Sequence, residues 1–181
     1  ALKLHSQGNI PEATKNYQYC LSQGFEDPRV LSNYGIILRN LGKLKEAEKY
    51  LRQAVEIEPN YANGLSNLGH ILRDLGQLKE AEIVLRKAIE FKPDSANYHF
   101  NLGNILNDLG RSEDAKISLR KAIQLKADFS DANYQLSLIL SGQNKFRAAL
   151  LEINKAIKND PANHIYKGEL NRLTFLSNEL D

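Results

Sequence analysis

The chain has 181 residues, of which 42% are hydrophobic, and this is enough apolar material for a continuous core. Its 24 basic and 22 acidic residues nearly cancel, so it lacks the basic excess of a nucleic-acid-binding surface, and no apolar run approaches the roughly 18 residues of a membrane span. No signal peptide is visible, and the single cysteine, Cys20, excludes an internal disulfide framework. We therefore expect a protein of a reducing compartment, with a cytoplasmic location.

Small residues recur along the chain with a period of 34 residues. The three recurring sets are Gly35, Gly69 and Gly103, with Ser137 at the next step; Ala13, Ala47, Ala81, Ala115 and Ala149; and Cys20, Ala54, Ala88, Ala122 and Ala156. A fixed period of this length predicts an all-α solenoid, in which each unit packs only on its neighbours. Chains of this kind usually present a binding surface, so we expect an interaction module and not an enzyme.

In chain order, residues 1–27 are typical of a partial repeat: the end of one helix and then a complete helix. The chain has no initiator Met and begins in the middle of a helical pattern, which favours a piece of a longer protein.

The first full repeat is residues 28–61, and its sequence predicts a pair of helices. Asp27 supplies an N-cap oxygen before Pro28, which suits the first helical position. Gly42 favours the left-handed conformation that ends a helix, and Pro59 blocks continuation of the second helix. We call the two members of each pair the first and the second helix.

The same pattern predicts full repeats at 62–95, 96–129 and 130–163, followed by a closing helix at 164–181. Asn60 is placed to cap the first helix of the second repeat. A glycine inside a helix costs about 1 kcal/mol relative to alanine. The retention of Gly35, Gly69 and Gly103 therefore predicts that the two helices of a pair approach too closely for a side chain.

This pattern resembles the tetratricopeptide repeat (TPR). Its copies read Leu31, Tyr34, Gly35, Leu38, Ala47, Leu51, Ala54, Pro59; then Leu65, Leu68, Gly69, Leu72, Ala81, Leu85, Ala88, Pro93; then His99, Leu102, Gly103, Leu106, Ala115, Leu119, Ala122, Ala127; and a weaker Asn133, Leu136, Ser137, Leu140, Ala149, Ile153, Ala156, Pro161. The resemblance implies a right-handed superhelical solenoid of helix-turn-helix units, with the first helices lining a concave face.

One polar slot of the first helices carries an amide in every repeat: Asn33, Asn67, Asn101 and Gln135. An amide can pair with both the N–H and the C=O of a passing peptide. Because packed helices lie about 8–10 Å apart, we expect successive amides every few residues along an extended chain. The row resembles the asparagine ladder of the superhelical TPR region of O-GlcNAc transferase, which implies that these residues hold an extended peptide. The alternative is that the amides bond within the solenoid or face water.

Polar residues beside this row could add specificity to the predicted peptide-binding groove. They are Asn63, Asn97, His70, Asn104, Arg39, Arg73 and Asn107. Arg39 and Arg73 could hold an acidic ligand side chain. The alternative is an ordinary solvated face on which Asp74 and Asp108 serve as counter-charges. The lysine–asparagine clamp with which other TPR proteins bind C-terminal carboxylates looks absent, because Ser32 and Ile36 occupy its first two slots.

A second periodic set is basic and lies on the second helices: Arg52, Arg86 and Arg120, beside Lys87, Lys121 and Lys155. Glu48 and Glu82 stand four residues before Arg52 and Arg86, which predicts ion pairs within each helix. The alternative is a docking stripe for an acidic partner or a nucleic acid.

The sequence predicts no cofactor, no metal and no catalytic residues, because its four histidines occupy four different repeat slots. The leading hypothesis is a scaffold that binds an extended segment of a protein, with no nucleic-acid or membrane partner. One alternative is a substrate-recruiting arm of a larger enzyme such as a glycosyltransferase. Another is a spacer, or a module that self-assembles into a homo-oligomer through exposed solenoid ends.

Overall fold

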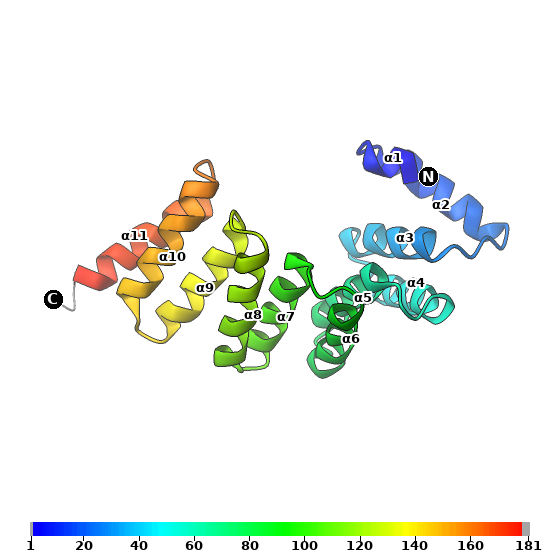
Figure 1. The fold of residues 1–181 in the computed structure, drawn as a ribbon. Coiled ribbons are helices and arrows are strands. Elements are labelled where there is room, and N and C mark those ends of the chain that lie inside the picture. The colour runs from blue at the N-terminus through cyan, green and yellow to red at the C-terminus, as the bar shows by residue number, and fades with distance from the viewer. Residues whose placement is uncertain (1, 179–181) are drawn as a thin grey trace. The chain divides into compact units, whose positions relative to one another are not determined.

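The computed structural model describes residues 2–178, and every regular element in that range is an α-helix (Figure 1). The helices are α1 (Leu2–Ser6), α2 (Ile10–Ser22), α3 (Pro28–Asn40), α4 (Leu44–Ile57), α5 (Ala62–Asp74), α6 (Leu78–Phe91), α7 (Ala96–Asp108), α8 (Ser112–Leu125), α9 (Ser130–Gly142), α10 (Phe146–Asn159) and α11 (His164–Asn178). They form two compact units, α1–α6 and α7–α11, which divide after Pro93. None of the described helices is long and apolar enough to cross a membrane.

Each unit is built from pairs of helices joined by short turns. Gly42, Gly76 and Gly110 follow three of the first helices with φ angles of 75°, 75° and 76°. This left-handed conformation confirms the predicted turn at the end of the first helix. In the turn between α9 and α10, Asn144 takes the same role with φ of 59°, which the sequence pattern had not indicated. Asparagine is one of the few residues other than glycine that adopt this conformation readily.

The start of α3 confirms one predicted cap, and the start of α5 corrects another. Asp27 Oδ1 accepts hydrogen bonds from the backbone N–H of Arg29 at 2.8 Å and of Val30 at 3.4 Å. The Arg29 guanidinium also donates to Asp27, and this bond holds the pKa of the carboxyl below its usual value. The prediction for Asn60 was wrong, because Tyr61 occupies the N-cap of α5 and makes no side-chain capping bond.

The two helices of a pair come closest at the interior glycines of the first helices. A Cβ on Gly35 would lie 2.9 Å from Leu51 Cγ, and one on Gly103 would lie 2.8 Å from Leu119 Cγ. These distances confirm the expected lack of room at both positions. Gly69 differs, because its nearest contacts would be at 3.5 Å, an ordinary van der Waals distance.

The fourth repeat replaces two of the expected core residues by polar ones. Ser137 occupies the glycine slot, is fully buried, and donates its hydroxyl to the Ala149 carbonyl oxygen at 3.0 Å. Asn133 occupies the slot of Leu31 and Leu65 and is only 1% exposed. Its Nδ2 donates to the Phe129 carbonyl, but its Oδ1 accepts no hydrogen bond within the described part of the chain. A buried acceptor left unpaired in this way costs about 1–3 kcal/mol.

Helix α11 packs against α10 and contacts α9 through side chains, and its exposed side carries polar residues as well as Ile165 and Phe175. The Tyr166 ring lies 5.1 Å from that of Tyr134, and burial, together with the bond that its hydroxyl donates to Asp131, raises the pKa of Tyr166. At the slots where α3 carries a core leucine, the packing glycine and a second core leucine, α11 carries exposed polar side chains. These are Lys167, Asn171 and Thr174.

The glycine geometry predicts opposite effects of alanine at two positions in the same unit. Gly35→Ala will lower the thermal midpoint, because overpacking costs about 1–3 kcal/mol, more than the gain of about 1 kcal/mol in helix propensity. Gly69→Ala will keep or raise the midpoint, because its methyl group has room. Thermal unfolding followed by circular dichroism measures both, and shifts in the same direction would contradict the assignment.

The unpaired acceptor predicts that Asn133→Leu will stabilise the second unit by about 1 kcal/mol, because it removes the desolvated oxygen. Asn154→Leu is the matched control, since Asn154 is exposed on α10. Urea unfolding of the two variants decides the matter. A loss of stability in Asn133→Leu alone would mean that the slot cannot accept the larger side chain.

Candidate functional site

In the first unit, both amides of the predicted row are oriented by other helices. Asn33 on α3 is half-buried and hydrogen-bonded to the hydroxyl of the buried Tyr17 on α2. Asn67 on α5 is also half-buried, and its Nδ2 donates to Ser32 Oγ on α3 at 2.9 Å. The expected alternative, bonding within the solenoid, therefore holds for one donor of Asn67. Its Oδ1 accepts no hydrogen bond from the described residues, so an acceptor remains for a ligand N–H.

Ser32 is the residue that fixes the amide of Asn67. It is 1% exposed on the buried side of α3, and its hydroxyl also hydrogen-bonds to the side chain of Tyr61. Burial raises the pKa of Tyr61, so this phenol stays protonated at neutral pH. The amide thus meets any ligand from one preset orientation, which lowers the entropy lost on binding.

Arg39 is a predicted flanking residue on α3, and its guanidinium already has a partner in the first unit. Its Nε donates to Asp74 Oδ2, at the end of α5, at 2.6 Å. This pairing agrees with the alternative interpretation, in which Asp74 is a counter-charge on a solvated face. A ligand carboxylate would have to compete with Asp74 for this guanidinium. Of the other predicted contacts in the first unit, Asn63 is exposed, whereas His70 and Arg73 are half-buried.

In the second unit, the amide slot is less accessible than expected. Asn101 on α7 is only 8% exposed, and Gln135 on α9 is half-buried. The flanking Asn97 is exposed and Asn104 half-buried. Asn107 Oδ1 accepts a weak hydrogen bond from the Ser112 hydroxyl at 3.4 Å.

The next step of the amide slot, 34 residues after Gln135, is Glu169 on α11, and the sequence analysis missed it. Glu169 is 8% exposed and receives two hydrogen bonds from the Arg172 guanidinium, at 2.6 and 2.8 Å. Arg172 also donates to Ser141 Oγ on α9 at 2.8 Å. On α11 this slot therefore contributes to packing against α9. The 34-residue period alone could have identified Glu169 as its occupant.

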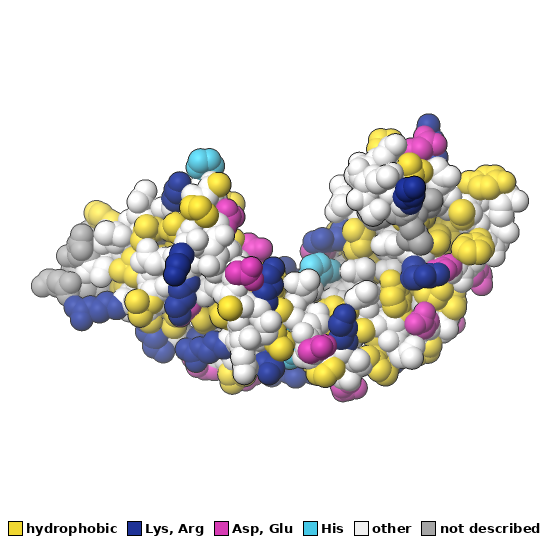
Figure 2. Space-filling model, turned by 45° about the horizontal axis from the view of Figure 1, so that its top comes forward, with side chains coloured by type: hydrophobic (Ala, Val, Ile, Leu, Met, Phe, Trp, Pro, Cys, Tyr) yellow, Lys and Arg dark blue, Asp and Glu magenta, His cyan; other side chains and the backbone are white. Residues whose placement is uncertain are grey.

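The basic residues of the second helices form the predicted ion pairs. Arg52 donates to Glu48 at 2.9 Å, and Arg86 donates to Glu82 at 2.8 Å. Arg52 also reaches Glu80 on α6 at 2.8 Å and so links α4 to the next second helix. Figure 2 shows Lys and Arg side chains among acidic and hydrophobic ones on the face in view. Within the described residues, no cluster of His, Cys, Asp and Glu has the geometry of a metal site.

Comparison with known families identifies the repeats. Tetratricopeptide repeat families match residues 26–94, 96–129 and 130–163. The chain belongs to the tetratricopeptide repeat family. The matches place α3–α10 in TPR units, and the fold is the all-α helical repeat expected from the 34-residue period. Among curated proteins, none matches this TPR chain in sequence.

Several solved TPR structures are similar to the chain. TTC0263, a thermophilic TPR protein of Thermus thermophilus, has a TM-score of 0.80 at 22% identity, over 96% of this chain and 95% of that one. YrrB, a TPR protein with an unusual peptide-binding site, gives 0.68 at 18%, over 90% and 84%. O-GlcNAc transferase of Thermobaculum terrenum gives 0.67 at 25%, over 72% of this chain and 26% of that one.

The bond between α3 and α5 predicts energetic coupling between Ser32 and Asn67. Replacing both by alanine will destabilise the TPR unit by less than the sum of the single changes, with a coupling of about 0.5–1.5 kcal/mol. Urea unfolding of the four proteins measures it. Ser32→Ala combined with Asn60→Ala is the control pair, for which we expect additivity. Additive effects for Ser32 and Asn67 would mean that the bond does not orient the amide.

Proposed function

We propose that the chain is a protein-interaction module that holds an extended peptide along its first helices through the amide row. Asn33 and Asn67 contribute in the first unit, and Asn101 and Gln135 in the second. The observation that carries the proposal is the Asn67 amide, which Ser32 orients while its carbonyl oxygen accepts no hydrogen bond from the described residues. An amide in this state can accept from a peptide N–H without first breaking a bond of its own.

Two further findings support this function. TPR proteins bind protein or peptide partners, and the similar YrrB structure is described as having a peptide-binding site. The flanking residues also present mixed chemistry: exposed amides at Asn63 and Asn97, and a guanidinium at Arg39 whose pairing with Asp74 is only partly buried. Surface pairs of this kind contribute about 0–1 kcal/mol, so a ligand carboxylate could replace Asp74 at small cost.

The similarity to O-GlcNAc transferase favours a second candidate, a substrate-recruiting arm of a larger enzyme. This chain covers only 26% of that protein, so the likeness concerns its TPR part. The two candidates differ in what they select. A recruiting arm that reads backbone would accept many unrelated sequences, whereas an adaptor would enrich one motif.

Selection of a random peptide library on the purified chain tests the proposal, with the double variant Asn33→Ala, Asn67→Ala selected in parallel. These two residues are half-buried, whereas Asn101 is nearly buried and its replacement could disturb the fold. We expect enriched peptides to bind the variant about tenfold more weakly or worse, since each lost hydrogen bond contributes about 1 kcal/mol.

The matched control changes two exposed asparagines outside the first helices, Asn60→Ala and Asn154→Ala, and should bind as the parent does. Circular dichroism checks that all variants keep their helicity. Equal enrichment on parent and double variant would show that peptides bind elsewhere. Absence of enrichment on either would favour a spacer or self-assembling module.

A further inference from the structure

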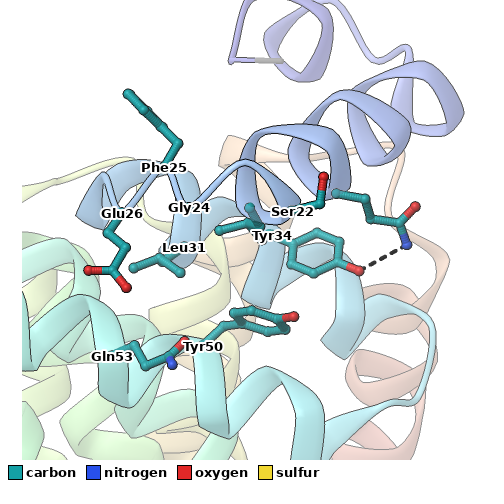
Figure 3. A pocket seen from close by; sticks show the side chains of 10 residues that line it. Ser22, Gly24, Phe25, Glu26, Leu31, Tyr34, Tyr50 and Gln53 are labelled. Carbon is teal, nitrogen blue, oxygen red and sulfur yellow. Dashed lines mark hydrogen bonds between the residues drawn. The ribbon is translucent and has the colours of Figure 1, made fainter.

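A second concave site lies in the first unit, between second helices α2 and α4. Two adjoining cavities of about 440 and 330 Å³ share Glu26, Leu31 and Gln53, so they form one continuous depression, here called the α2–α4 trough. Figure 3 shows the larger of the two cavities. The remaining lining residues are Gln18, Leu21, Ser22, Gly24, Phe25, Tyr34, Tyr50, Glu56 and Ile57. None of them belongs to the amide row, so the trough is a separate site.

One wall of the trough is aromatic and held in place. Tyr34 and Tyr50 meet edge to face with ring centroids 5.0 Å apart, and Gln18 Nε2 donates to the Tyr34 hydroxyl at 3.0 Å (Figure 3). Tyr34 is buried and Tyr50 is half-buried, so the Tyr50 ring is the one within reach of a ligand. At the rim, Phe25 is 53% exposed in the connection that follows Gly24. Gly24 has φ of 74° and ends α2 there.

The charge of the trough is acidic and uncompensated. Glu26 and Glu56 both line the smaller cavity, and neither carboxylate forms an ion pair within the described part of the chain. Lys, Arg and His are absent from the described residues that line the two cavities. This contrasts with Glu48 on the same helix, which is paired with both Lys45 and Arg52.

The repeat pattern shows that the missing cation is particular to this place. The slot of Gln53 is a lysine in each of the three following second helices, Lys87, Lys121 and Lys155. One repeat later, the position of Tyr50 is occupied by Val84 in α6, and the position of Glu26 is occupied by Asn60. The corresponding place beside α6 therefore lacks the aromatic ring and adds a positive charge.

We propose that the α2–α4 trough binds an arginine side chain of a partner protein, with the guanidinium beside Glu26, which lines both cavities, its plane against Tyr50 in the larger cavity, and Glu56 adding negative charge from the smaller cavity. Arginine fits better than lysine because its planar fork matches carboxylates and stacks on aromatic rings. A cation over an aromatic face is attracted by the negative charge of the ring face, and the accessible side of the half-buried Tyr50 can supply this attraction. The exposed Phe25 and Ile57 offer an apolar surface to the residue beside that arginine.

NMR titration of the isotopically labelled chain tests this with blocked amino acids as probes: N-acetyl-arginine amide, and its lysine, glutamine and glutamate counterparts. We expect arginine to shift the amide signals of residues 18–26 and 50–57 with a Kd of about 1 mM, and lysine to bind more weakly. Glutamine and glutamate should leave these signals in place. Equal shifts with all four probes, or none with arginine, would overturn the proposal.

Variants locate the site. Glu26→Gln with Glu56→Gln should weaken arginine binding about tenfold, because a charge-assisted contact becomes neutral and a nearby negative charge is lost. Tyr50→Val, the residue of the α6 slot, should weaken it severalfold. Glu90→Gln changes the counterpart of Glu56 on α6 and is the matched control, expected to bind as the parent does. Unchanged binding in the Glu26, Glu56 variant would place the arginine elsewhere.

The proposals for the trough and for the amide row can be overturned independently of each other. The variant Asn33→Ala, Asn67→Ala should bind the arginine probe normally even if it loses peptides in library selection. If the same signals instead move on dilution of the protein without any probe, a second copy of the chain occupies the trough, and the arginine assignment is wrong.

Discussion

The contact on which the structure depends is the approach of a first helix to its partner at an interior glycine. At Gly35 and Gly103 there is no room for a Cβ beside the leucine of the second helix. Where it is present, this contact sets the separation of the two helices, so the core slots of these first helices meet the same residues of the second helix. A periodic sequence can then place side chains of one kind in a row. Where the contact relaxes, as at Gly69, ordinary packing keeps the pair together.

Neighbouring first helices within a unit are joined by side-chain hydrogen bonds with the same spacing in sequence. Asn67 bonds to Ser32, Asp74 to Arg39, and Tyr166 to Asp131, and each pair is separated by 35 residues. These side chains share the first helices with the amide row. The face proposed for peptide binding therefore also carries hydrogen bonds that join neighbouring first helices. A ligand must bind to the donors and acceptors that these bonds do not use.

Much of the fold followed from the sequence because its determinants are local. The period, the glycine turns and the Asp27 cap each depend on a few adjacent residues. The Asn67–Ser32 bond and the burial of Asn101 depend on how whole helices pack, and no local pattern encodes that. Gly69 occupies the same motif slot as Gly35, yet the room for a Cβ differs between them by tenths of an ångström. The α2–α4 trough escaped notice because its residues come from three helices and the connection after α2, and most of them are not repeated 34 residues later.

The exposed polar residues in three repeat slots of α11 give the stack a direction. A second helix of a further repeat needs an apolar groove to dock into, and Lys167, Asn171 and Thr174 offer hydrated groups in its place. A further repeat therefore docks more readily before α11 than beyond it. In protein engineering terms, α11 is a starting point for a stop module, but its exposed Ile165 and Phe175 would have to be replaced by polar residues before a grafted copy yields a solenoid that does not stick to itself.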